Sequence, residues 1–295
     1  MKIAIIGNSH FGTILAKQLS KFDTENEYVF YNTYESTIDK VKYIINLLHI
    51  DIVYCLSASI RGGLALKLAS FSGKKIVQHF IGSDVLTVIE DYNNKVYSSD
   101  LLNNSSYLCE IDWIQDELKE IGINAEIVSI MAYEEKNEPK EFINFSVLTY
   151  IGQNRAEFYG INSFIKLAND FPDVVFKIAG IESYPNLPVN IKCLGWVNMI
   201  EELQKSTIFI RNAEHDGLGF SIIEALSVGR QVFYNYNFPY IHYFKSYNDL
   251  STKLKLVFMR FKENKLKINF EAIEYIHKEF NKEKVLKNLV LAIQK

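Results

Sequence analysis

The stretch HDGLGFSIIEALSVGR, residues 215–230, gives the clearest indication of the fold of the second half of the chain. Ser221 followed three residues later by Glu224 is a capping-box pattern, which predicts that a helix begins near Ile222. The residues before it, TIFIRN (207–212), form an apolar run typical of a buried strand. The stretch therefore predicts a strand, a loop and a helix in that order.

The loop itself carries two glycines and an acid. Gly217 and Gly219 would let backbone N–H groups approach a ligand closely. The helix N-terminus carries partial positive charge, so the loop favours a phosphate group, with the carboxylate of Asp216 near hydroxyl groups. The alternative is that Glu224 only caps the helix and Asp216 is a solvated loop acid.

Short apolar runs alternate with helical patterns on both sides of this stretch, which predicts parallel sheets covered by helices on both faces. In the first half, strands are expected at 2–6, 28–32, 51–57, 74–80 and 125–130, and helices at 12–21, 36–48, 61–71 and 109–121. In the second half, strands are expected at 146–152, 174–180, 190–197, 207–212 and 231–235, with helices near 158–169 and from 221. The last 45 residues are expected to be helical.

The segment MAYEEKNEPKEFIN (131–144) separates the two halves, because it offers little that could form a core. We expect an N-terminal Rossmann-like domain on the acceptor side at 1–140 and a nucleotide-sugar-binding one at 141–270. A final helix, 271–295, is expected to cross back to the first domain. Ligands are expected at the carboxyl ends of the strands, in the cleft between the domains.

Composition narrows the class of protein further. The chain has 295 residues, 48% of them apolar, and a net charge of −3, which gives no reason to expect nucleic acid as a partner. Its three cysteines are far apart, as is typical of buried thiols in a reducing compartment. The N-terminal apolar run is too short for a signal peptide or membrane span, so we expect a cytoplasmic protein.

The first strand runs into a glycine turn, IAIIGNSHFG, that partly fits the dinucleotide-binding fingerprint. Gly7 and Gly12 fit, but Ser9 replaces the middle glycine, and no acid closes the second strand to bind a ribose. A nicotinamide-dependent oxidoreductase is therefore disfavoured. The turn is either a purely structural strand-to-helix connection or one in which Gly12 lines a ligand site.

The run from 216 to 230 resembles the E-x7-E signature of retaining GT-B glycosyltransferases and is most similar to glycosyltransferase family 4. LTYIGQNRAEFYGINSFIKLA (148–168), FPDVVFKIAG (171–180) and NIKCLGWVNMIEELQKSTIFIRN (190–212) are similar to the family's other motifs, in the family's order. The closing EFNKEKVLKNLVLAI resembles its last helix, and KKIVQHFIGSDVL its histidine-bearing segment. The resemblance covers most of the chain and is strongest over 146–235.

The resemblance implies roles for individual residues. Glu224 would hydrogen-bond the ribose of the donor nucleotide, and Asp216, in place of the family's first Glu, would contact the hydroxyls of the donor sugar. His79 would reach the donor sugar from the first domain, and the base would lie near Val197. The remaining donor-binding positions of the loop and helix are Gly217, Gly219, Phe220 and Ser221.

The family's two cations that cradle the diphosphate are replaced by Gln153 and Tyr159. Arg155 in the same loop could supply the charge, because its guanidinium suits phosphate geometry. Asp84, which follows the histidine segment, would either bind acceptor hydroxyls or cap a helix.

These features predict a hexosyltransferase-like enzyme that moves a sugar from a nucleotide-diphosphate donor, UDP- or GDP-linked, to a hydroxyl with retention of configuration. The acceptor would be a glycan, a lipid-linked molecule or a protein. Metal independence is expected, because the chain contains no DxD triplet. No cofactor is expected, since the nucleotide-diphosphate sugar is the donor substrate. The alternatives are a catalytically weak or inactive sugar-nucleotide-binding protein and a sugar-nucleotide epimerase.

The C-terminal segment 251–295 is rich in lysine. It holds 11 Lys and Arg against 5 Asp and Glu. Basic amphipathic helices can rest on acidic membranes, so peripheral contact with the inner face of the membrane is one interpretation, and a solvated helix face is the other. The sequence does not indicate an oligomeric state.

Overall fold

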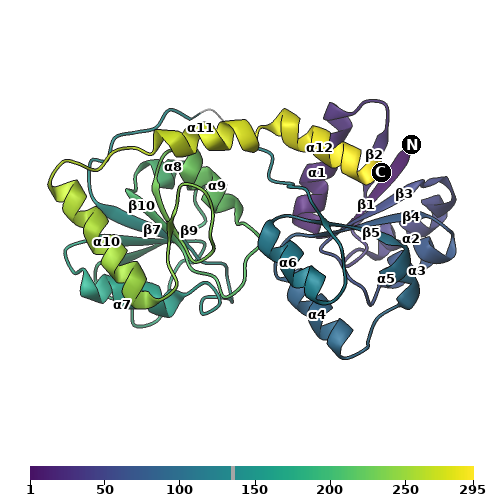
Figure 1. The fold of residues 1–295 in the computed structure, drawn as a ribbon, viewed down its shortest axis with the longest axis horizontal. Coiled ribbons are helices and arrows are strands. Elements are labelled where there is room, and N and C mark those ends of the chain that lie inside the picture. The colour runs from purple at the N-terminus through teal and green to yellow at the C-terminus, as the bar shows by residue number, and fades with distance from the viewer. Residues whose placement is uncertain (134–136) are drawn as a thin grey trace. The chain divides into compact units, whose positions relative to one another are not determined.

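The computed structural model describes residues 1–133 and 137–295 and divides the chain into two compact units. The first unit comprises Met1–Ala132 together with Asn281–Lys295, and the second comprises Tyr133–Phe280. Each unit is built around one six-stranded parallel sheet (Figure 1). Part of the predicted linker, residues 134–136, lies outside the described residues.

The sheet of the first unit has the strand order β2-β1-β3-β4-β5-β6, with every pair parallel. Its strands are β1 (Lys2–Gly7), β2 (Glu27–Phe30), β3 (Ile52–Leu56), β4 (Lys75–Phe80), β5 (Ser105–Cys109) and β6 (Glu126–Ile127). Its helices are α1 (Ser9–Phe22), α2 (Thr37–Asn46), the 3-10 turn η1 (Leu47–His49), α3 (Leu64–Phe71), α4 (Asp84–Asn93), α5 (Ser99–Asn104), α6 (Asp112–Glu120) and α12 (Lys282–Gln294).

The sheet of the second unit has the order β12-β11-β10-β7-β8-β9, and it too is parallel throughout. Its strands are β7 (Ser146–Tyr150), β8 (Val175–Ala179), β9 (Ile191–Gly195), β10 (Ile208–Arg211), β11 (Gln231–Tyr234) and β12 (His242–Tyr243). Its helices are α7 (Ile161–Asp170), α8 (Met199–Gln204), α9 (Phe220–Ser227), α10 (Tyr247–Lys262) and α11 (Phe270–Glu279).

The strand order of each sheet reverses direction once, and this reversal marks where a ligand can bind. In the second unit, the chain goes from β7 outward to β8 and β9, and then returns to place β10 on the other side of β7. The loops after β7 and β10 therefore diverge and leave a crevice at the carboxyl ends of the strands. In the first unit the equivalent reversal lies between β1 and β3.

Apolar side chains pack on both faces of each sheet. The continuous apolar runs of β1, β3 and β4 are buried because helices cover the sheet on both sides. Helix α12 packs against α1 and β3 of the first unit and adds Leu286, Leu289 and Ile293 to its core (Figure 1). The first unit is therefore assembled from two segments that are distant in the sequence.

Candidate functional site

The loop after β10 is held by a buried ion pair. Arg211, the last residue of β10, donates from Nη2 to Oδ1 of Asp216 at 2.7 Å and from Nε to Oδ2. The Tyr234 hydroxyl, at the end of β11, donates to Oδ2 of Asp216 at 2.8 Å. Asp216 is only 7% exposed, so its carboxylate points into the loop and bonds Arg211 and Tyr234.

The electrostatics of this pair favour the charged forms. Burial alone would raise the pKa of Asp216, but the charge and hydrogen bonds of Arg211, together with Tyr234 and the Gly217 N–H, hold that pKa below its ordinary value. The carboxylate is therefore ionised over the whole physiological range. The predicted contact between Asp216 and sugar hydroxyls stays a prediction.

The glycine at the start of α9 is required by Arg211. A Cβ on Gly219 would lie 2.4 Å from Cζ of Arg211, closer than any side chain allows. The preceding Leu218 is buried and has a φ of 67°, a left-handed conformation that is uncommon for a non-glycine residue. The loop is thus folded tightly around the guanidinium.

The predicted capping box at the start of this helix is wrong. Helix α9 begins at Phe220, its N-cap is Gly219, and no side chain caps it. Ser221 lies inside the helix with its Oγ 3.5 Å from Nη1 of Arg211. The sequence pattern misled because the helix begins one residue before Ser221, which places Gly219, an accepted N-cap residue, at the cap. Glu224 is half-buried in the middle of α9.

The loop after β7 presents the cation that sequence analysis selected. Arg155 is exposed, and its Cζ lies 3.8 Å from the ring centroid of Phe158 and 5.9 Å from that of Tyr159. The Tyr159 ring also lies near a second guanidinium, because its centroid is 5.4 Å from Cζ of Arg211. Tyr159 therefore lies near both Arg155 of the loop after β7 and Arg211 at the end of β10.

An open cavity of about 830 Å³ lies beside Arg155. It is lined by the loop after β7, by the residues that follow β8 and by Glu214 of the loop after β10: Gln153–Phe158, Ile181–Tyr184 and Glu214. The Glu214 N–H donates to the carbonyl of Phe158 at 2.9 Å, which joins the two loops. The cavity thus stands where the strand order reverses.

Aromatic residues at the strand ends are site candidates that the sequence analysis missed. Trp196, directly after β9, is 74% exposed, and its ring centroid lies 6.4 Å from that of Tyr150 at the end of β7. Val197 follows in the same loop and is half-buried. An exposed tryptophan beside an expected base-binding position was a signal in the sequence, because large rings offer stacking surfaces.

The site residues predicted in the first unit are less exposed than Arg155 of the second unit. His79 lies in β4 with no exposed surface, and its Nδ1 pairs with the Tyr54 hydroxyl at 2.7 Å. Burial lowers the pKa of His79 to about 3, so the imidazole is neutral at pH 7. Asp84 accepts backbone N–H groups of Ala58, Ile81 and Gly82, which ties the loops after β3 and β4 together.

The glycines of the first turn are explained by packing. A Cβ on Gly7, which has a φ of 102°, would lie 1.8 Å from the carbonyl oxygen of Leu56. A Cβ on Gly12 would lie 2.3 Å from the ring of Phe30. These contacts require glycine at both positions without any ligand. A ligand contact for Gly12 stays a prediction.

The two sheets match the predicted GT-B fold of two Rossmann-like domains, and similar solved structures are GT-B glycosyltransferases. No family model matches the sequence, and no curated protein matches it either. At 10–16% identity, the structural likeness establishes the fold alone.

Three solved structures illustrate the likeness. A glycosyltransferase from Rickettsia africae ESF-5 has a TM-score of 0.70 and 16% identity, covering 100% of this chain and 98% of that one. The lipopolysaccharide outer core galactosyltransferase WaaB has a TM-score of 0.66 and 15% identity, with 100% and 99% covered. S. aureus TarM, in complex with fondaparinux, alpha-GlcNAc-glycerol and UDP, has a TM-score of 0.63 and 15% identity. The TarM match covers 83% of this chain and only 55% of TarM.

Over residues 1–133 and 137–295, no helix has both the length and the apolar character of a membrane span. Within the same residues, no group of three or more His, Cys, Asp and Glu side chains is arranged to hold a metal ion.

Proposed function

We propose that this protein is a retaining glycosyltransferase of the family 4 type, which transfers a hexose from a UDP- or GDP-linked sugar to a hydroxyl group. The observation that carries the proposal is the cavity beside Arg155 at the reversal point between β7 and β10. Open parallel sheets bind ligands at this point. Named glycosyltransferases with the same fold support the choice of ligand.

The donor diphosphate would be held by Arg155 and by the start of α9. Arg155 is an exposed guanidinium in the loop after β7, and the α9 N-terminus adds partial positive charge. Both stabilise the leaving diphosphate as positive charge grows on the sugar, which is electrostatic preorganisation. Glu224 would bind the ribose, and Trp196 with Val197 would contact the base.

Residues of the first unit would contact the donor sugar and the acceptor. His79 and Asp84 are the candidates for contacts with donor sugar and acceptor, and Gly12 is the candidate for a further ligand contact in this unit. Because His79 is fully buried and neutral, its Nε2 would serve as a hydrogen-bonding atom and not as an acid. The acceptor would be a glycan, a lipid-linked molecule or a protein at the cytoplasmic side of the membrane.

One observation favours a second candidate function. The carboxylate of Asp216 is engaged by Arg211 and Tyr234, whereas the family's first acid contacts the donor sugar. A chain whose sugar-binding acid is committed to its own loop would bind a nucleotide sugar without transferring it. Binding without turnover would identify this case.

Donor binding and turnover test the proposal separately. A panel of nucleotides and nucleotide sugars is screened by thermal shift, since a ligand that binds only the folded state raises the melting temperature. Release of free nucleotide diphosphate then reports hydrolysis or transfer. We expect Arg155→Gln to weaken donor binding at least tenfold, whereas Arg260→Gln on the exposed face of α10 leaves it unchanged.

Two results would overturn parts of the proposal. If no nucleotide diphosphate stabilises the protein, the donor site is wrong. If Asp216→Asn and Glu224→Gln both keep the wild-type transfer rate, the assignment of the acids is wrong. Metal independence is tested by adding EDTA to the transfer assay, where we expect no loss of rate.

A further inference from the structure

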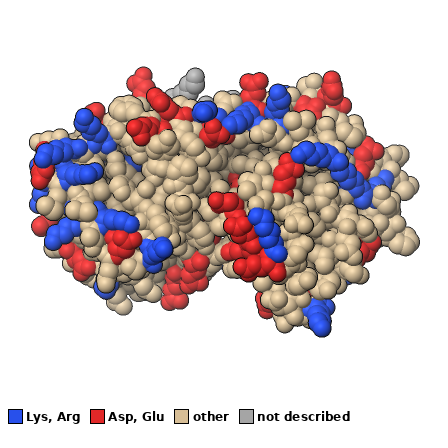
Figure 2. All heavy atoms as spheres, viewed as in Figure 1, with Lys and Arg blue, Asp and Glu red and all other residues tan. Residues whose placement is uncertain are grey.

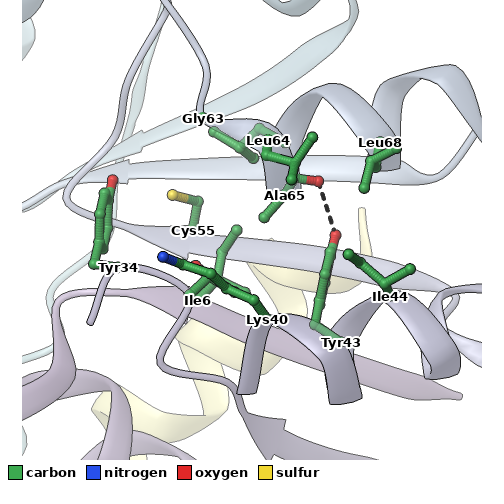
Figure 3. A pocket seen from close by; sticks show the side chains of 12 residues that line it. Ile6, Tyr34, Lys40, Tyr43, Ile44, Cys55, Gly63, Leu64, Ala65 and Leu68 are labelled. Carbon is green, nitrogen blue, oxygen red and sulfur yellow. Dashed lines mark hydrogen bonds between the residues drawn. The ribbon is translucent and has the colours of Figure 1, made fainter. Parts of the chain in front are cut away.

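A pocket of about 290 Å³ opens between α2 and α3 of the first unit (Figure 3). Its floor is one face of the sheet, because Ile6 of β1 and Cys55 of β3 line it and are buried. Ile44 of α2 and Leu64 of α3 form the more exposed part of its wall, and Leu64 is 64% exposed. The pocket therefore reaches from solvent down to the sheet.

A fixed contact between the two helices shapes this space. The Tyr43 hydroxyl of α2 donates to the carbonyl of Ala65 in α3 at 3.1 Å, and the Tyr43 side chain is buried. Ala65 also lines the pocket and contributes only a methyl group to the wall. The space beside the Tyr43 ring is therefore left unfilled by the folded chain itself.

The pocket has one charged residue among the described residues that line it. Figure 3 shows the Lys40 side chain along one side, with its ammonium directed toward the end where Tyr34 lies. The neighbouring acid on α2 does not pair with it, because Asp39 accepts the Asn32 N–H at 3.1 Å and lies 4.0 Å from Nζ of Lys42. The apolar pocket thus holds a cation without a carboxylate partner among the described residues.

The other acids around α2 and α3 do not supply that partner. Each of them bonds a backbone N–H, a hydroxyl, an amide or the Arg61 guanidinium: Glu35, Asp51, Asp84, Asp91 and Asp100. On the side in view in Figure 2, Lys and Arg side chains lie among Asp and Glu side chains on both units. An anion would therefore be attracted by the groups of the pocket and not by a broad positive surface.

The groups near the ammonium are neutral hydrogen-bond donors. Burial raises the pKa of the Cys55 thiol to about 12, so it carries no charge at pH 7. The hydroxyls of Thr33 and Tyr34 belong to residues that line the same pocket. Gly63, the N-cap of α3, also lines it, and no side chain caps this helix, so its N-terminus adds partial positive charge. One ammonium with neutral donors matches the single negative charge of a carboxylate, whereas a phosphate dianion would leave charge unbalanced.

The size of the pocket limits its ligand. Its volume of about 290 Å³ is roughly ten times the ~30 Å³ that one water molecule occupies in the liquid. A ligand of about ten non-hydrogen atoms fills such a space. A long acyl chain exceeds it.

We propose that this pocket binds a small carboxylic acid with an apolar body, of the size of a one-ring aromatic acid. The body would lie against Ile44, Leu64 and Leu68, and its carboxylate would accept hydrogen bonds from the Lys40 ammonium and the Tyr34 hydroxyl. The site goes beyond the proposed transferase activity and does not depend on it. The cavity beside Arg155 belongs to the second unit, and neither His79 nor Asp84 lines the pocket between α2 and α3.

Nuclear magnetic resonance of the full chain, labelled at its isoleucine methyl groups, tests the site with 3-phenylpropanoate as the probe. We expect the signals of Ile6 and Ile44 to shift as the probe is added, because both line the pocket. The matched reporter is Ile5, the neighbour of Ile6 in β1, which packs in the core on the opposite face of the sheet and should not shift. The uncharged 3-phenylpropanamide should bind about tenfold more weakly, since it cannot form a hydrogen bond between charged groups.

Variants test the individual contacts. Lys40→Gln should weaken binding of 3-phenylpropanoate about tenfold, because the cation is lost. Lys42→Gln is the matched control on the same helix, since this exposed lysine does not line the pocket, and it should leave the affinity unchanged. Ala65→Leu keeps the carbonyl that Tyr43 uses but fills the space beside it, and should also weaken binding about tenfold. Circular dichroism of each variant distinguishes a loss of binding from a loss of fold.

Four results would overturn the inference. These are no shift at Ile6 and Ile44, an equal shift at Ile5, equal affinity for the acid and its amide, and equal affinity in the wild type and Lys40→Gln. Arg155→Gln separates this site from the proposed donor site, because it should weaken nucleotide binding and leave binding of 3-phenylpropanoate unchanged. Loss of acid binding in Arg155→Gln would place the acid in the donor cavity and would also overturn the inference.

Discussion

Asp216 illustrates how one side chain can serve a loop instead of a ligand. It is one methylene shorter than the glutamate of the family signature, and its carboxylate reaches Arg211 and Tyr234 of its own unit. A buried ion pair is costly to break, because the remaining partner stays charged away from water. The acid at the first position of the signature therefore stabilises the conformation of the loop between β10 and α9.

Asp216→Asn should therefore destabilise the fold itself. We expect the free energy of unfolding to fall by about 3 kcal/mol, since the substitution leaves the Arg211 guanidinium buried without its counter-charge. Urea denaturation followed by circular dichroism measures the change. The control is Asp249→Asn, which breaks a more exposed pair with Lys253 and should cost much less. Equal losses in the two variants would contradict the role given to Asp216.

Glu110 gives the first unit a dependence on pH. It is 1% exposed, and burial raises its pKa to about 8, although it accepts hydrogen bonds from Ser129 and from the N–H of Ile130. An acid with a raised folded pKa stabilises the protein while it holds its proton. That stability is lost as the pH rises from the ordinary value of 4.5 through 8.

The variant Glu110→Gln should remove this dependence. Between pH 5 and 8 the wild type should lose about 1 kcal/mol of unfolding free energy per pH unit from this group, while the variant stays flatter. Denaturation curves at four pH values measure the two slopes. Parallel slopes for wild type and variant would refute the assignment to Glu110.

At the element scale, the start of α9 depends on the contact between Gly219 and Arg211. Gly219 has a φ of −64°, which any residue can adopt, so its requirement for glycine is one of space and not of backbone conformation. This distinguishes it from Gly160, whose φ of 72° adds a conformational requirement to a close contact with Asn212.

Gly219→Ala should accordingly cost about 2 kcal/mol, because the new methyl group overlaps the guanidinium of Arg211. The matched control is Gly63→Ala at the start of α3, where a Cβ meets nothing within 4 Å. As a change of N-cap residue without a clash, it should cost roughly 0.5–1 kcal/mol, less than Gly219→Ala. In an Arg211→Ala background the cost at Gly219 should disappear, and its persistence there would contradict the steric explanation.

Most of the elements were predictable, because buried parallel strands are continuous apolar runs that local pattern detects. Strand β5 escaped because Ser105–Cys109 begins with two serines, and its burial comes from its neighbours β4 and β6. The ion pair of Asp216 could not be predicted, since it depends on how the loop after Arg211 folds back, and Tyr234 joins it only after β10 and β11 pair. The pocket between α2 and α3 lies between two predicted helices, but only the fold shows which of their side chains line it.

At the scale of the whole molecule, the first unit is completed by the C-terminal helix. Helix α12 contributes Leu286, Leu289, Ala292 and Ile293 to the core around β1 and β3. Leu289→Ala should lower the stability of this unit by 2–5 kcal/mol, roughly the cost of a cavity in a well-packed core. Hydrogen exchange resolved by segment measures it, and the largest loss of protection should fall in 1–132. Loss confined to 133–280 would contradict the grouping of α12.

This discontinuity has a consequence for biosynthesis. Residues 281–295 are made after the whole second unit, yet they pack against α1 and β3, which are made before it. During translation the apolar side chains of α1 and β3 that α12 covers stay exposed while the second unit is synthesised and folds. The nascent chain is therefore most prone to aggregate, and most dependent on chaperones, in the interval before residues 281–295 leave the ribosome.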